Sequence, residues 1–151
     1  RRHTRYGTVT GVQTCALPIY ARAAWAVVFP DHPQYDISGL LEGEQTNNRA
    51  EFTAIIRALE TTCGPIHVFT DSMLALKIAT HQWSAKKNLD LVARLDALTK
   101  NRSITWTHVK AHTGKNGYES RWNAVADERA TRLLSTSSSD EYPDRTNSQV
   151  Q

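Results

Sequence analysis

The hydrophobic pattern is clearest over residues 46–60, TNNRAEFTAIIRALE. Apolar residues recur there at spacings of three and four, the period of a helix with one buried face; they are Ala50, Ala54, Ile55, Ala58 and Leu59. Thr46 or Asn47 is expected to cap this helix, and Cys63-Gly64-Pro65 to end it. Glu51 lies within the apolar stripe, where a carboxylate is costly unless it is paired or binds a metal. Glu51 therefore needs a partner from elsewhere in the chain.

Shorter runs predict the other elements. Residues 23–29, AAWAVVF, form an apolar run closed by Pro30, which is typical of a buried strand. Residues 35–41 are rich in β-favouring types and are expected to pair with it as an antiparallel strand. Further strands are predicted over 66–70 and 104–109, and further helices over 73–80, 89–98 and 123–134. This order of elements predicts an α/β fold with a mixed sheet.

The two ends of the chain lack such patterns. Residues 1–19 mix turn formers with isolated hydrophobic residues, and they resemble the conceptual translation of a sequencing-library adapter. A genuine leader with a poor pattern is the alternative. Residues 136–151 are polar and without period, which is typical of disorder. We expect a non-native leader over 1–19, one folded domain over 20–135 and a disordered tail over 136–151.

Composition narrows the class of protein only moderately. The 151 residues are 40% hydrophobic and 22% charged, as in ordinary globular domains. No apolar run approaches the roughly 18–20 residues of a membrane-spanning helix, so no membrane partner is expected. Two cysteines do not suggest a disulfide scaffold. We therefore expect a reducing compartment, the cytoplasm, or the nucleus or an organelle if the source is eukaryotic.

Basic residues are concentrated in the interval 77–115, where eight basic side chains face only Asp90 and Asp96; the basic ones are Lys77, Lys86, Lys87, Arg94, Lys100, Arg102, Lys110 and Lys115. A solvated face explains this excess as well as a surface that follows nucleic-acid phosphates does. Trp83 lies in the same interval, and its simplest interpretation is a core residue. The net charge of +3 permits a polyanionic partner without demonstrating one.

Two further carboxylates are placed like that of Glu51. Asp71 directly follows the predicted strand 66–70, and open α/β sheets place their ligands at such strand ends. Asp127 is in phase with the apolar residues Ala130 and Leu134 of the last helix. Each alone is more often a helix cap or a buried ion pair. Three converging carboxylates would repel one another unless cations lie between them, and oxygen ligands favour Mg²⁺ or Mn²⁺ over Zn²⁺.

Four motifs occur in an order that resembles type 1 ribonuclease H: TNNRAE at 46–51, TDS at 70–72, VKAHTG at 109–114 and NAVAD at 123–127. The resemblance covers residues 21–134. It implies a three-layer ribonuclease H-like fold, with a five-stranded mixed sheet flanked by helices. It also implies an endonuclease that hydrolyses the RNA strand of RNA–DNA hybrids with two Mg²⁺ ions, Mn²⁺ being an alternative.

The resemblance assigns roles to individual residues. Glu51, Asp71 and Asp127 would be metal ligands and catalytic residues. His112 would assist proton transfer or product release, for which a pKa near neutrality is suited.

Substrate contacts follow from the same resemblance. Asn47 and Asn48 would bind the RNA strand, whose 2′-hydroxyl distinguishes it from DNA; capping of the helix is their alternative role. Ser72 would contact a sugar or phosphate oxygen, and Trp83 the DNA strand. Lys86, Lys87 and Asn88 are candidates for phosphate contacts. A monomer is expected.

One departure from the family pattern bears on activity. The first strand of the family ends in Asp-Gly-Ser, but no aspartate precedes Asp31 here. The missing motif would fall near residues 11–14, so the first strand is missing or replaced. We therefore expect the chain with this sequence to be inactive or nearly so. Two alternatives stay open: a hybrid-binding module without catalysis, and the ribonuclease H domain of a retroelement polyprotein.

Overall fold

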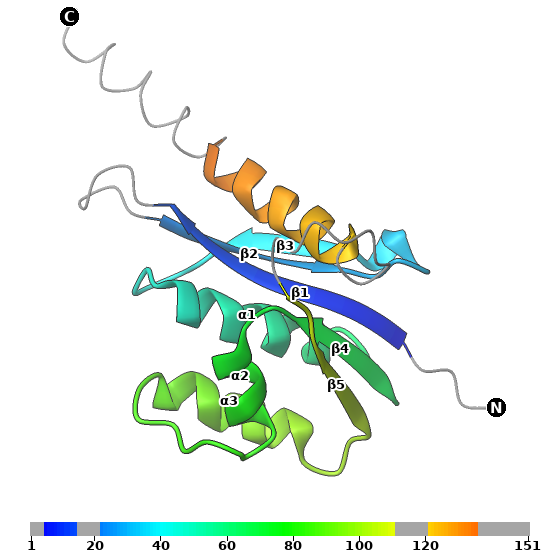
Figure 1. The fold of residues 1–151 in the computed structure, drawn as a ribbon, viewed down its shortest axis with the longest axis vertical. Coiled ribbons are helices and arrows are strands. Elements are labelled where there is room, and N and C mark those ends of the chain that lie inside the picture. The colour runs from blue at the N-terminus through cyan, green and yellow to red at the C-terminus, as the bar shows by residue number, and fades with distance from the viewer. Residues whose placement is uncertain (1–4, 15–21, 111–120, 136–151) are drawn as a thin grey trace, which may run out of the picture.

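The computed structural model describes residues 5–14, 22–110 and 121–135. The strands are β1 (Arg5–Thr14), β2 (Arg22–Val28), β3 (Ile37–Leu40), β4 (Ile66–Thr70) and β5 (Ile104–His108). The helices are α1 (Asn47–Glu60), α2 (Met73–Ala79), α3 (Leu89–Thr99) and a C-terminal helix over residues 121–135, with a 3-10 turn at Pro33–Tyr35. Figure 1 shows the sheet between these helices. The predicted elements are confirmed, with boundaries shifted by a few residues.

The five strands form one sheet in the order β3-β2-β1-β4-β5. The β1–β2 and β2–β3 pairs are antiparallel, whereas β1–β4 and β4–β5 are parallel. The sheet is therefore mixed, as the sequence of elements predicts. Its parallel half ends at Thr70 and His108, next to Asp71.

β1 is the central strand, although its sequence predicts no element. Its backbone pairs with β2 from Thr8 to Thr14 and with β4 from Arg5 to Val9. One partner, β2, is the next strand along the chain, whereas the other, β4, lies about 60 residues away. A local hydrophobic pattern does not report such pairing. Residues 5–14 thus occupy the place of the first strand, which the sequence alone leaves missing or replaced.

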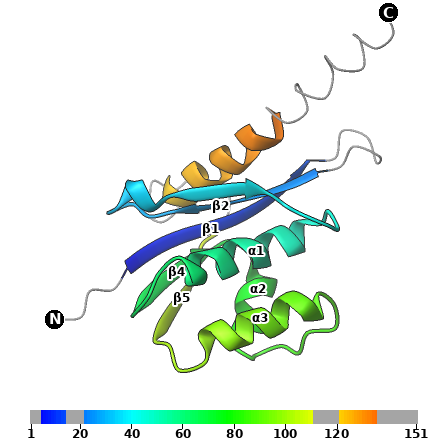
Figure 2. The same ribbon diagram turned by 180° about the vertical axis from the view of Figure 1, so that it is seen from behind.

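The alternation of β2 explains its unbroken apolar run. Ala24, Ala26 and Val28 pack against the C-terminal helix, and Trp25 and Val27 pack against the core under α1. Figures 1 and 2 show α1, α2 and α3 on one face of the sheet and the C-terminal helix on the other. Because both faces are covered, every side chain of β2 after Arg22 is buried.

α1 is the helix on which the core is built. Thr46 caps it, since its side chain accepts a hydrogen bond from the backbone N–H of Arg49. Of the two predicted caps the structure thus selects Thr46. Asn47 and Asn48 begin the helix and are exposed, so neither serves as the cap. Eight side chains of α1 are buried; they are Ala50, Glu51, Phe52, Ala54, Ile55, Ile56, Ala58 and Leu59.

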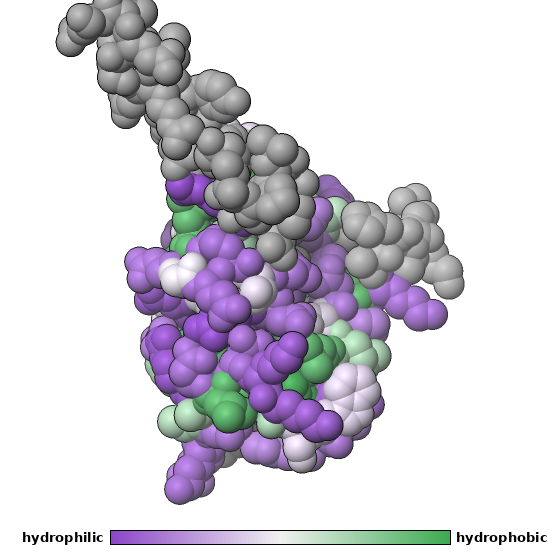
Figure 3. Space-filling model, turned by 90° about the vertical axis from the view of Figure 1, so that its left-hand side faces the viewer, coloured by the Kyte–Doolittle hydropathy of each residue, from purple (hydrophilic) through white to green (hydrophobic). Residues whose placement is uncertain are grey.

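One face of the molecule is mainly polar. The face in Figure 3 is dominated by hydrophilic residues, with separate hydrophobic patches between them. Trp83 is 50% exposed, so its interpretation as a core residue is wrong. Within the described part of the chain, no helix has the length and apolarity needed to cross a membrane.

Candidate active site

Asp71 lies at the carboxyl end of the parallel half of the sheet. It follows Thr70, whose buried carbonyl oxygen accepts a hydrogen bond from Val109 N and whose hydroxyl accepts one from Ser72 N. The strand end is thereby fixed on both sides. Asp71 itself is partly buried, at the kind of strand end where open α/β sheets bind ligands.

Glu51 is brought into the protein by α1. Glu51 is only 3% exposed, which confirms that its position on the apolar face of the helix buries it. It is the fifth residue of α1 and belongs to the second turn of the helix. Glu51 is therefore held in place by the packing of the helix.

Asn123 connects the C-terminal helix to Asp71. Its Nδ2 lies 3.4 Å from Oδ2 of Asp71, a long hydrogen bond. Asn123 is 6% exposed, and its Oδ1 has no hydrogen-bond partner among the described residues. Sequence reasoning placed Asn123 in a motif but missed it as a site residue. The available signal was its position one helical turn before Asp127, on the same helix face.

The electrostatics of Asp71 indicate a need for positive charge. Burial raises the pKa of its carboxyl group, the hydrogen bond from Asn123 opposes this, and the charge of Asp127 raises the pKa further. The structure thus brings Asp71 within electrostatic reach of Asp127. A cation bound here would stabilise the ionised form.

The donor set suits a hard cation, but it is incomplete. Carboxylate oxygens and the buried amide oxygen of Asn123 are the ligands that Mg²⁺ and Mn²⁺ prefer. Across residues 5–14, 22–110 and 121–135, no three His, Cys, Asp or Glu residues are gathered closely enough to hold a metal ion. The predicted carboxylates therefore do not form a complete metal centre by themselves.

The register of β1 shows where a further ligand would belong. The parallel β1–β4 register ends at the pair Val9 and Thr70, and the next positions on the two strands are 10 and 71. The place beside Asp71 on β1 is therefore position 10, one residue before the range 11–14 predicted for the missing motif. In the antiparallel β1–β2 register, position 10 pairs with Ala26. The residue at position 10 is threonine. The place next to Asp71 on the central strand thus carries no carboxylate.

His108 is a second neighbour of Asp71 that sequence reasoning missed. It ends β5, and its Nε2 lies 3.2 Å from the backbone oxygen of Asp71. Its contact runs between two strands, so no local pattern reports it. His112, the predicted proton-transfer residue, lies outside the described residues.

The predicted substrate-binding residues lie around the N-termini of three helices. Asn47 and Asn48 are in the first turn of α1, and Ser72 caps α2 by accepting a hydrogen bond from Ala75 N. Lys86 and Lys87 are exposed in the segment between α2 and α3, and the partly buried Asn88 precedes α3 directly.

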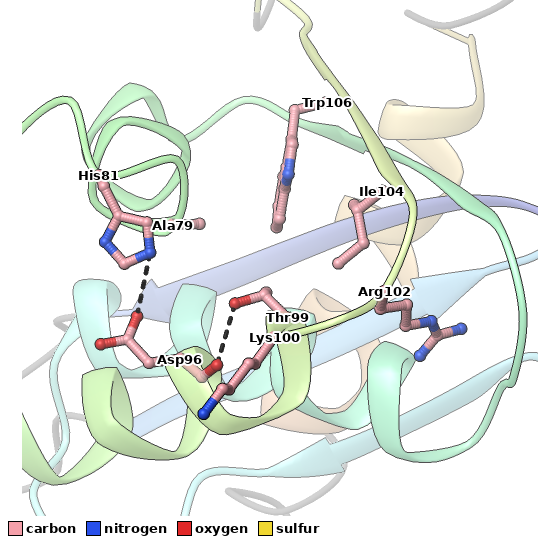
Figure 4. A pocket seen from close by; sticks show the side chains of 8 residues that line it. All are labelled: Ala79, His81, Asp96, Thr99, Lys100, Arg102, Ile104 and Trp106. Atoms are coloured by element: carbon pink, nitrogen blue, oxygen red, sulfur yellow. Dashed lines mark hydrogen bonds and ion pairs between the residues drawn. The ribbon is translucent and has the colours of Figure 1, made fainter.

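A cavity of about 440 Å³ lies elsewhere, between α2, α3 and β5 (Figure 4). Its lining is Ala79, His81, Asp96, Thr99, Lys100, Arg102, Ile104 and Trp106. His81 Nε2 lies 3.8 Å from Oδ1 of Asp96 across it. None of the predicted site residues lines this cavity, so it is separate from the carboxylates.

The sheet order and the carboxylates on α1, after β4 and on the C-terminal helix define a ribonuclease H-like protein. Solved structures agree with this class. Ribonuclease H1 from Halobacterium salinarum matches with a TM-score of 0.67 at 24% identity, over 89% of this chain and 99% of the other. LC11 ribonuclease H1, solved in complex with an RNA/DNA hybrid, matches with a TM-score of 0.70 at 21% identity, over 89% and 99%.

Sequence comparison establishes the family. A sequence model of the RNase H family matches residues 15–135, so the chain belongs to the ribonuclease H family. Ribonuclease H of Methylobacillus flagellatus is 37% identical over 59% of this chain and 68% of its own length. The Schizosaccharomyces pombe ribonuclease H is 38% identical over 64% of this chain but only 42% of its own length. This family consists of endoribonucleases that act on RNA–DNA hybrids with divalent metal ions.

Proposed function

We propose that this chain is an RNA–DNA hybrid endonuclease by descent, and that as written it binds the hybrid but cleaves it poorly. The observation that carries the proposal is the residue at position 10. Glu51, Asp71 and Asp127 are present, whereas the place level with Asp71 on β1 holds threonine. The site therefore has fewer anionic ligands than its predicted metals require.

The metals of the proposed site are two Mg²⁺ ions, with Mn²⁺ as a substitute. Glu51, Asp71 and Asp127 would hold them, because these side chains supply the oxygen ligands that hard cations prefer. Bound Mg²⁺ supplies positive charge that activates water and stabilises a departing oxygen. The raised pKa of Asp71 supports this assignment, since the group is poised to gain from a neighbouring cation.

Other side chains of the chain would hold the substrate. Asn47 and Asn48 present amide groups from the exposed first turn of α1, where they would contact the 2′-hydroxyls of the RNA strand. Lys86, Lys87 and Asn88 would contact backbone phosphates. His112 would move a proton near the leaving oxygen.

The test restores a carboxylate at the position that the register identifies. Thr10→Asp should raise hybrid cleavage in Mg²⁺ or Mn²⁺ by more than about 100-fold, because a lost metal ligand costs more than the 10–100-fold typical of its outer-shell partners. Thr10→Asn is the matched control, since it has nearly the same shape without the charge, and it should leave cleavage near that of the unaltered chain.

Two outcomes would change the proposal. Rapid cleavage by the unaltered chain would show that the carboxylate on β1 is dispensable. Tight hybrid binding without cleavage by either variant would favour the non-catalytic binding module, the second function that threonine at position 10 supports.

A further inference from the structure

The guanidinium of Arg49 joins the N-terminus of α1 to that of α3. Its Nη1 donates hydrogen bonds to Oδ1 of Asn88 at 3.2 Å and to Oδ1 of Asp90 at 3.0 Å. Its Nη2 donates to Oδ2 of Asp90 at 2.7 Å. The side chain of Arg49 is only 16% exposed. A forked contact of this kind fixes direction as well as distance.

This contact determines how the amide of Asn88 is oriented. A guanidinium has only donors, so the amide must turn its oxygen toward Arg49. The Nδ2 group of Asn88 then points away from Arg49 and is the donor left to meet a ligand. Asn88 has a left-handed backbone (φ 58°, ψ 37°) and its side chain makes no capping hydrogen bond into α3. Within the part of the chain that the structure describes, Arg49 is what orients this amide.

Arg49 is a poor candidate for a direct phosphate contact. Its hydrogen bonds with Asp90 lower the pKa of that carboxyl to about 2 and raise the pKa of Arg49. Both groups are charged at neutral pH, so the pair presents little net charge. The neighbouring Lys86 and Lys87 are exposed and able to meet phosphates directly.

We infer that Arg49 is a positioning residue that aims the amide of Asn88 at a phosphate of the bound hybrid. It thereby fixes this contact relative to Asn47 and Asn48, which precede it in the same helical turn. The inference rests on the proposed function, because it assumes that a hybrid is bound here. It adds a role for a side chain that would itself not touch the hybrid.

The same two helices provide a matched control. Arg94 of α3 donates a hydrogen bond to Glu60 at the far end of α1, at 2.8 Å. This pair also links α1 to α3, but it lies about three helical turns from Arg49 along α1. Arg94→Lys therefore matches Arg49→Lys in chemistry and differs in location.

The experiment measures binding of a fluorescent RNA–DNA hybrid by anisotropy, in EDTA so that nothing is cleaved. Arg49→Lys keeps the charge but removes the fork, and it should weaken binding about fivefold, the value of one hydrogen bond. Asn88→Ala should weaken binding by a similar factor, and the double variant should bind no more weakly than Asn88→Ala alone. Arg94→Lys should bind as the unaltered chain does.

Salt dependence provides a second readout. Arg49→Gln should leave the slope of log K against log salt unchanged, whereas Lys86→Gln should reduce it by about 0.9 if Lys86 neutralises one phosphate. If Arg49 has only a structural role, Arg49→Lys should lower the melting temperature, but Arg49→Lys and Arg94→Lys should bind the hybrid with the same affinity.

The outcomes separate the inference from the function on which it rests. If the unaltered chain does not bind the hybrid, the proposed function fails first. If it binds and Arg49→Lys binds equally tightly, only the positioning role is overturned. Additive losses in the double variant would also overturn it, because Arg49 would then act on the hybrid without Asn88.

Discussion

Arg102 uses its whole guanidinium to hold the end of α1. Its Nε donates to the carbonyl oxygen of Gly64, its Nη1 to that of Leu59 and its Nη2 to the hydroxyl of Thr62. The contact with Leu59 satisfies one of the carbonyl groups that the end of a helix leaves without partners. The other two contacts hold the segment that follows α1. Burial lowers the pKa of Arg102, so the group is held by geometry at some cost in desolvation.

This contact divides the basic interval that the sequence presents as one surface. Arg102 holds the end of α1, and Arg94 pairs with Glu60, so both already have partners within the protein. Lys86 and Lys87 remain exposed. Charge counts along the chain cannot make this distinction, because the partners of Arg94 and Arg102 lie more than 30 residues away.

The pair of Arg49 and Asp90 makes a pH-dependent contribution to stability. The pKa of Asp90 is lowered to about 2 in the folded chain, against about 3.9 in an unfolded one. A depressed carboxyl pKa stabilises the fold above the unfolded value, and this stabilisation is lost as the pH falls from about 4 toward 2. The pair is largely exposed on the side of Asp90, so salt should weaken the effect.

We therefore expect the difference in free energy of unfolding between the unaltered chain and Asp90→Asn to be constant above about pH 5. It should shrink between about pH 4 and pH 2, where the unfolded chain takes up a proton at Asp90 while the folded chain still holds the charged carboxylate. Urea unfolding at a series of pH values measures this difference. A difference that stays constant down to pH 2 would show that the pair does not set the pKa of Asp90.

At the scale of single residues, sequence reasoning succeeds where the local period decides the outcome. Glu51 is buried because its neighbours at helical spacing are apolar. Asn123 and His108 were missed because both approach Asp71 from distant elements. The capping of α1 by Thr46 was one of two options that the residue types left open, and backbone geometry selected it.

Among the elements, the antiparallel pair of β2 and β3 shows how a large side chain on one strand can require glycine at the paired position of the other. Trp25 pairs with Gly39 across the two strands. A Cβ at position 39 would lie 2.8 Å from Cζ2 and 3.0 Å from Cε2 of the indole ring. Glycine therefore leaves the space that the ring of Trp25 occupies, and Trp25 is almost fully buried.

Gly39→Ala should destabilise the fold by about 1–3 kcal/mol, the usual cost of forcing extra volume into a packed site. Urea unfolding followed by tryptophan fluorescence measures the loss. Ser38→Ala is the control, because Ser38 is exposed on the same strand and such changes usually stay within about 0.5 kcal/mol. An equal effect of both substitutions would mean that the ring of Trp25 yields without cost.

Elements with a strong local pattern were predicted well, and β4 was predicted over its whole length, residues 66–70. β1 was not predicted, because its stability comes from pairing with β2 and β4. β-propensity depends on such context more than helix propensity does. The local sequence pattern therefore does not predict β1, although β1 joins β2 and β4 in the sheet.

For the whole molecule, β1 decides whether there is one sheet or two fragments. It lies between β2 and β4, which have no contact in the ladder without it. Removing it would leave a β2–β3 hairpin and a β4–β5 pair, each with an unpaired edge. Two-stranded units are marginally stable at best in water. The segment that resembles adapter sequence is therefore the structural centre of the fold.

A chain that lacks residues 1–14 should consequently lose cooperative unfolding, whereas a chain that lacks residues 136–151 should keep it, since that polar segment offers little apolar surface to bury. Thermal unfolding followed by circular dichroism, with near-ultraviolet spectra as a check on tertiary packing, compares the two truncations. A cooperative transition in the chain without residues 1–14 would mean that β2 and β4 find another way to pair. In that event β1 would not be fixed in the sheet, and Thr10→Asp could not place its carboxylate beside Asp71. If the chain without residues 1–14 unfolds cooperatively and Thr10→Asp does not restore cleavage, the loss of activity is due to the fold and not to the missing carboxylate alone.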